Sequence, residues 1–74
     1  MNKFRPSNYS ILNAVKEAAR YESIYVGDNY VMKDHGDYVE VNIDAENKGL
    51  HISYNVYFKE NGEIVAKLHE KYKK

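Results

Sequence analysis

Apolar and polar residues alternate strictly between positions 50 and 59, where the sequence reads LHISYNVYFK. The apolar members of this stretch are Leu50, Ile52, Tyr54, Val56 and Phe58. Residues two positions apart lie on the same face of a β-strand, whereas an α-helix would scatter them around its circumference. The pattern therefore predicts a strand with one face on a hydrophobic core and the other toward solvent.

A different spacing, with apolar residues three and four positions apart, begins after Pro6 and continues to about Tyr21. Its apolar members are Ile11, Leu12, Val15, Ala18 and Ala19. This is the spacing of an amphipathic helix, and Ser7 or Asn8 can accept a hydrogen bond from its first free amides. Because proline is not tolerated inside a helix, residues 1–7 are predicted to be a lead-in to one helix of about 14 residues.

Two similar turn sequences, residues 33–37 and 59–63, divide the remaining chain. Each reads Lys, acid, Asn or His, Gly, acid, between strand-like residues. A three-residue loop at 60–62, with Gly62 left-handed, sets apolar residues opposite apolar ones: Phe58 with Ile64, Val56 with Ala66, Tyr54 with Leu68. A two-residue loop would shift the register by one and reverse every side chain, so the three-residue loop is favoured.

The same loop in the first hairpin would pair Val31 with Val39. Residues 22–29 favour a short extended segment and a turn, followed by a strand from about Tyr30. Residues 44–49 are predicted to form a polar connection between the hairpins. Closing it antiparallel gives the pairs Ile43–Leu50, Val41–Ile52 and Val39–Tyr54.

These elements predict a single α+β domain over residues 1–74, with an N-terminal helix packed on one face of a four-stranded antiparallel meander. Residues 70–74 are expected to be a basic tail. One alternative stays open, because Ile64, Val65, Leu68 and Tyr72 also have helical spacing. A helix there would give the order α-β-β-β-α.

Charge and composition narrow the class of protein. Eleven basic residues balance eleven acidic ones, which argues against attachment to nucleic acid or lipid by bulk charge. No cysteine is present, so disulfides and thiolate metal sites are excluded. The sequence also has no apolar run of signal-peptide or membrane-span length, which predicts a cytoplasmic protein without membrane attachment. Lys, Asn, Tyr and Ile together make 30 of the 74 residues; their A/T-rich codons suggest a low-GC bacterium, a phage or another mobile element.

The candidate chemistry is sparse, and we expect neither an enzyme nor a bound metal or cofactor. In the predicted register His51 and His69 are diagonal neighbours on the sheet, roughly 7–8 Å apart at Cβ, and His35 is at the other end. Three such residues do not make the close ligand set that zinc requires. Ser53 would lie across from His69, but an open sheet has no cleft that excludes water or holds an oxyanion.

Eight tyrosines are more than a small core can bury, and tyrosine is enriched at protein interfaces. We therefore expect a protein-binding module, acting as a small regulator or inhibitor on an unidentified protein partner. The residues predicted to bind this partner are Tyr38, Glu40, Asp44, His51, Tyr57 and His69. The alternative is nucleic-acid binding, with sheet tyrosines stacking on bases and Lys67, Lys71, Lys73 and Lys74 on phosphates. Self-association through the edge of the last strand is compatible with either.

Overall fold

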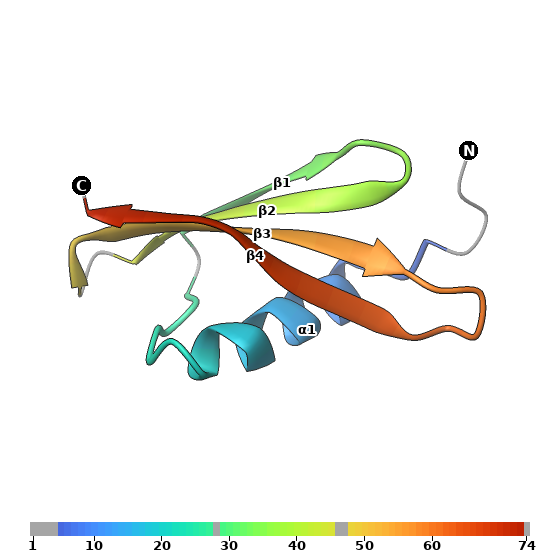
Figure 1. Ribbon diagram of the computed structural model, residues 1–74, viewed down its shortest axis with the longest axis horizontal. Helices are drawn as coiled ribbons and strands as arrows, with labels where there is room; N and C mark the ends of the chain where they lie inside the picture. The colour runs from blue at the N-terminus through green and yellow to red at the C-terminus, as the bar shows by residue number, and fades with distance from the viewer. Residues whose placement is uncertain (1–4, 28, 46–47, 74) are drawn as a thin grey trace.

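The computed structural model describes residues 5–27, 29–45 and 48–73. One helix precedes four strands: α1 (Asn8–Arg20), β1 (Tyr30–Asp34), β2 (Tyr38–Ala45), β3 (Leu50–Phe58) and β4 (Ile64–Lys73). The strands form one antiparallel sheet in the order β1-β2-β3-β4, and α1 lies beneath β3 and β4 (Figure 1). The predicted meander is confirmed. The alternative C-terminal helix is wrong, because Ile64–Lys73 pairs with β3, and residues 70–73 belong to this strand rather than to a tail.

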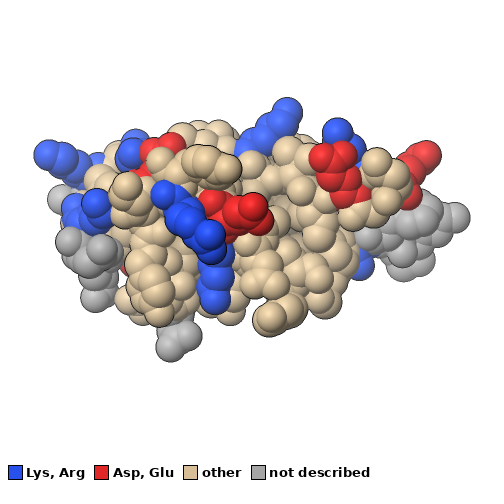
Figure 2. Space-filling model, turned by 90° about the horizontal axis from the view of Figure 1, so that it is seen from below, with Lys and Arg blue, Asp and Glu red and all other residues tan. Residues whose placement is uncertain are grey.

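Helix α1 begins at Ser7, the N-cap, whose hydroxyl accepts a hydrogen bond from the Ser10 amide at 3.2 Å. The side chains of Ile11, Val15 and Ala19 are four residues apart and buried, so one stripe of the helix faces the sheet. The surface seen from the helix side carries basic and acidic side chains among many uncharged ones (Figure 2).

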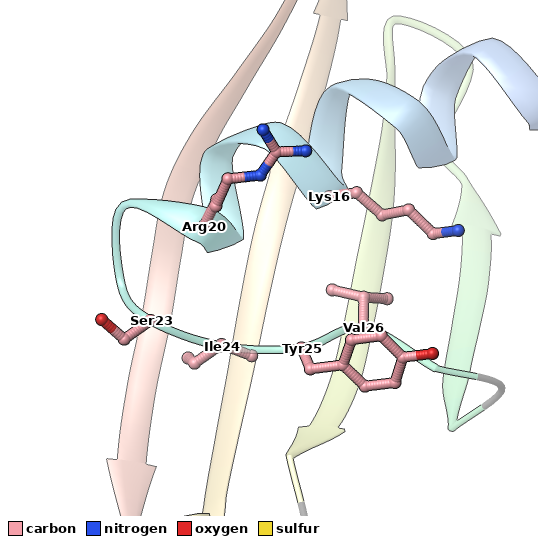
Figure 3. A pocket seen from close by; sticks show the side chains of 6 residues that line it. All are labelled: Lys16, Arg20, Ser23, Ile24, Tyr25 and Val26. Atoms are coloured by element: carbon pink, nitrogen blue, oxygen red, sulfur yellow. The ribbon is translucent and has the colours of Figure 1, made fainter.

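An extended segment follows the helix and covers the part of the sheet that α1 leaves open. The chain reverses at Ser23, which has a left-handed φ of 57°, and the Ile24 amide donates to the Ala19 carbonyl at 3.0 Å. Residues 23–26 then cross the strands beside the helix (Figure 3). Ile24 and Val26 are buried by this path.

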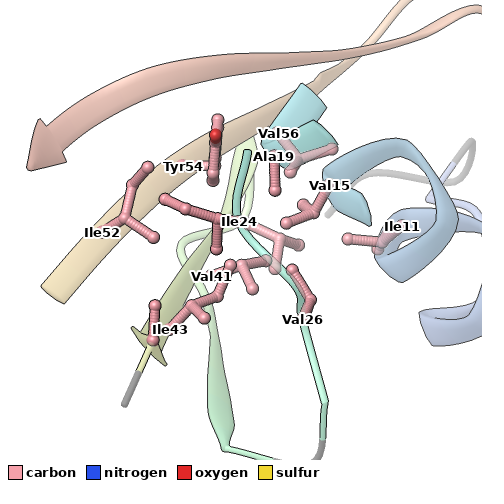
Figure 4. Close-up of a cluster of buried hydrophobic side chains, with 12 residues drawn as sticks. Ile11, Val15, Ala19, Ile24, Val26, Val41, Ile43, Ile52, Tyr54 and Val56 are labelled. Atoms are coloured by element: carbon pink, nitrogen blue, oxygen red, sulfur yellow. The ribbon is translucent and has the colours of Figure 1, made fainter. Parts of the chain in front are cut away.

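The hydrophobic core lies between the sheet and the layer formed by α1 and the extended segment that follows it (Figure 4). It contains Ile11, Val15, Ala19, Ile24, Val26, Val39, Val41, Ile43, Ala45, Ile52, Tyr54 and Val56. Each valine or isoleucine that is fully buried contributes about 1.5–3 kcal/mol, so these side chains fix which face of the sheet is inside.

The pairing of β3 with β4 begins as predicted. Phe58 lies opposite Ile64, Val56 opposite Ala66, and Tyr54 opposite Leu68, and Gly62 in the loop has a φ of 90°. Beyond this point β4 contains a β-bulge: Ser53 pairs with Glu70, so His69 is an extra residue.

The bulge exchanges the two faces of β4. Before it, Ile64 and Ala66 pack against the core. After it, Lys71 and Lys73 lie opposite Ile52 and Leu50, on the helix side. The Lys71 ammonium contacts the Glu22 carboxylate at 2.7 Å, which agrees with this reversal.

The predicted register between β2 and β3 is wrong by two residues. Ala45 pairs with Leu50, Ile43 with Ile52, Val41 with Tyr54, and Val39 with Val56. The connection is therefore shorter than expected, and Asp44 belongs to β2. Because side chains alternate with period two, a shift of two leaves every residue on its predicted face.

The predicted pair Val31–Val39 is also wrong, and here the face changes. Val31 lies opposite Asn42 and is 65% exposed, while Tyr30 and Met32 pack against the core. The loop has two residues instead of three, since the His35 amide donates to the Tyr38 carbonyl at 2.9 Å. This turn places Asp34 opposite Val39 and moves the register by an odd number of residues.

Candidate functional site

The sheet face opposite α1 is not covered by any described element of the chain, and we call it the outer face. Strand alternation places on it Tyr38, Glu40, Asn42, Asp44, His51, Ser53, Asn55 and Tyr57, together with Val31 and Lys33 of β1 and Val65, Lys67, Glu70 and Tyr72 of β4. Five of the six predicted partner-binding residues are therefore on one surface. The sixth, His69, is the extra residue of the bulge.

Rings in contact form a row across one end of the outer face. The rings of His35 and Tyr38 are 4.7 Å apart and nearly parallel, and those of Tyr38 and Tyr57 are 5.5 Å apart. The Lys67 ammonium lies 5.8 Å from the centre of the Tyr57 ring. Aromatic pairs at such distances each contribute about 0.5–1.5 kcal/mol beyond burial, so these contacts restrain the rings of the row.

A second group of side chains occupies the other end of this face. His51 Nδ1 is 3.3 Å from the Asp44 carboxylate, and its ring stacks on Tyr72 at 4.9 Å. Tyr72 was not predicted to belong to the site. Without the bulge Lys71 would have been opposite His51, and the sequence contains no signal that reveals the extra residue.

Polar side chains lie between the two groups. The Glu40 carboxylate accepts a hydrogen bond from Asn42 at 2.7 Å and contacts His35 at 2.9 Å. These two contacts, with Asn42 the stronger, lower the pKa of Glu40, so it is ionised at neutral pH. Ser53, at the centre of the sheet, is 1% exposed, and its hydroxyl has no hydrogen-bond partner among the described residues.

The lysines proposed for nucleic-acid binding do not gather on one surface. Lys67 is on the outer face beside Tyr57, whereas Lys71 and Lys73 are on the helix side and Lys71 is paired with Glu22. Lys74 lies outside the described residues. The outer face itself carries Glu40, Asp44 and Glu70, so a strong positive field for phosphates is not present there.

The predicted Ser53–His69 neighbourhood does not form, because the bulge puts Glu70 opposite Ser53. His35 and His51 are paired with separate carboxylates, those of Glu40 and Asp44. Among the described residues no group of three His, Cys, Asp or Glu side chains could hold a metal ion. The single described helix is too short and too polar to cross a membrane.

The fold and this face define a class: a small α+β domain with one covered and one uncovered sheet face. No protein-family model matches the sequence. Comparisons with curated proteins and with solved structures also find no match.

Proposed function

We propose that the chain is a non-enzymatic, cytoplasmic protein-binding module that acts as a small regulator or inhibitor through its outer face. The main support is that the two groups of stacked side chains lie on an uncovered surface. Tyr57 and Tyr72 remain 37% and 51% exposed there. Rings already held by their neighbours lose little conformational freedom on binding, which favours affinity.

The charges on the outer face suggest the chemistry of the partner. Glu40, Asp44 and Glu70 outnumber Lys33 and Lys67, and the surrounding rings offer apolar contact with polar tips. A partner surface with exposed Lys or Arg and a few apolar side chains would complement this arrangement. The basic, nucleic-acid-binding groove of another protein is a surface of this kind. The high content of Lys, Asn, Tyr and Ile, whose codons are A/T-rich, favours a phage or mobile-element protein aimed at a bacterial host.

Site-directed cross-linking tests this proposal. A photoreactive amino acid is placed at position 55, in the middle of the outer face, in the wild-type background and in the double variant Tyr57→Ser/Tyr72→Ser. The matched control is Tyr21→Ser, because Tyr21 is 87% exposed at the end of α1, away from this face.

Cross-linking in extracts of a low-GC bacterium should give one defined adduct with the wild type and with Tyr21→Ser. The double variant should give much less of this adduct, although its thermal unfolding followed by circular dichroism should remain cooperative. An adduct of equal yield in all three proteins, or no adduct with a folded wild type, would argue against the outer face as the contact surface.

A further inference from the structure

A groove lies on the other side of the molecule, between α1 and the extended segment that follows it (Figure 3). Its volume is about 400 Å³. The residues that line it are Lys16, Arg20, Ser23, Ile24, Tyr25 and Val26. None of them belongs to the outer face, so the groove is independent of the function proposed above.

Two cations border this groove without a carboxylate of their own. Lys16 and Arg20 are four residues apart, which places them on neighbouring turns of one helix face. Neither forms an ion pair within the described part of the chain, although Arg5, Lys59 and Lys71 do. Their charge is therefore available to an anionic group from outside.

The opposite wall is a stretch of extended backbone. Ile24 and Val26 turn their side chains into the core, and Tyr25 between them is 79% exposed. The Tyr25 ring lies over Gly27, where a Cβ would be only 3.3 Å from it. Within residues 5–27, 29–45 and 48–73 the amides of Tyr25 and Val26 have no hydrogen-bond partner. Because Ile24 and Val26 are buried, Tyr25 is the residue of this stretch whose backbone is open to pairing with a peptide strand.

We propose that this groove binds an acidic, extended segment of a partner protein. Its carboxylates pair with Lys16 and Arg20, its backbone pairs with that of Tyr25, and alternate apolar side chains pack beside the Tyr25 ring. A free inorganic anion would use only the two cations. A peptide uses the cations, the backbone and the ring together, which is why we favour it.

The probe is the acetylated and amidated hexapeptide Glu-Val-Glu-Val-Glu-Val, titrated into the ¹⁵N-labelled protein and followed by NMR. Amide signals of residues 16–27 should move, while those of Asn42, Asn55 and Tyr57 on the outer face should not. The double variant Lys16→Gln/Arg20→Gln should weaken binding by about 2- to 30-fold, since each of the two exposed ion pairs contributes about 0.2–1 kcal/mol. The matched control, Lys33→Gln/Lys67→Gln, removes two cations from the outer face and should leave binding unchanged.

The proposal would be overturned by no movement of residues 16–27 at millimolar peptide, by movement confined to the outer face, or by equal weakening by both double variants. Inorganic phosphate that moved the same amides with the same affinity would also overturn it, because the site would then hold an ion only. The peptide Gln-Val-Gln-Val-Gln-Val should bind more weakly than the acidic one, and Tyr25→Ser should weaken binding where Tyr21→Ser does not.

Discussion

Replacing Tyr54 by phenylalanine should stabilise the protein. Tyr54 lies in the core at 2% exposure, and its hydroxyl has no hydrogen-bond partner among the described residues. A buried hydroxyl that lost its water without gaining a partner costs about 1–3 kcal/mol. Tyr54→Phe removes that group and keeps the ring, so the free energy of unfolding should rise by about 1–2 kcal/mol. In a domain of this size the melting temperature should then rise by about 5–10 °C.

The effect should also depend on pH. Burial raises the pKa of the Tyr54 hydroxyl above 10.0, and the Glu22 carboxylate raises it further. In alkaline solution the Tyr54 hydroxyl therefore ionises in the unfolded chain at a lower pH than in the folded chain. Ionisation of this group does not reduce the free energy of unfolding below pH 10.0 and reduces it above that pH. Phenylalanine removes this loss, and the advantage of Tyr54→Phe should grow as the pH rises beyond that value.

Urea unfolding followed by circular dichroism measures both effects. The midpoint should increase with an unchanged slope, because the surface exposed on unfolding is the same. Tyr21→Phe is the control, since an exposed hydroxyl changes stability by less than about 0.5 kcal/mol. If Tyr54→Phe lowered stability by 1 kcal/mol or more, the hydroxyl would have to be hydrogen-bonded in the native state, and our account of the core would be refuted.

Three further predictions concern the cap, the acidic groups and the bulge. Ser7→Ala removes the N-cap hydrogen bond and should cost about 1 kcal/mol in a urea titration, whereas Ser7→Asp should cost little. The Gly36 amide and the Arg5 guanidinium lower the pKa of Asp34. The ionised Asp34 carboxylate therefore stabilises the fold above pH 3.8, and this stabilisation is lost as the pH falls further. Asp34→Asn should flatten the acid side of a plot of the free energy of unfolding against pH. Deleting His69 should preserve every other pair of β3 with β4, so an NMR spectrum that showed loss of the Leu50–Lys73 end of the sheet would contradict our register.

The sequence determined the β3–β4 hairpin because two signals agree there. Alternation from Leu50 to Phe58 fixes the inner face, and Gly62 supplies the left-handed residue that a three-residue loop requires. In β1 the residues Tyr30, Val31 and Met32 are all apolar, so no alternation identifies the inner side. The turn decides it, through a hydrogen bond from the Gly36 amide to the Asp34 carboxylate at 2.8 Å.

Most of the outer face followed from the same alternation, because β2 and β3 kept their predicted faces despite a register error. Tyr72 could not be predicted, since its position depends on one unpaired residue in a polar stretch. The groove between α1 and residues 24–26 also could not be predicted from the sequence. Lys16 and Arg20 meet residues 24–26 only because the chain reverses at Ser23, and φ/ψ values at such a reversal have no periodic signature.

The extra residue at His69 also has a consequence for growth of the sheet. β4 is a ten-residue edge strand, and a long, regular edge strand can pair with strands from other molecules. An inserted residue breaks the even spacing of amides and carbonyls along that edge, and the positive charges of Lys67 and Lys73 add repulsion between copies. This edge of the sheet thus resists polymerisation into larger sheets, although the outer face beside it is not covered by any described element.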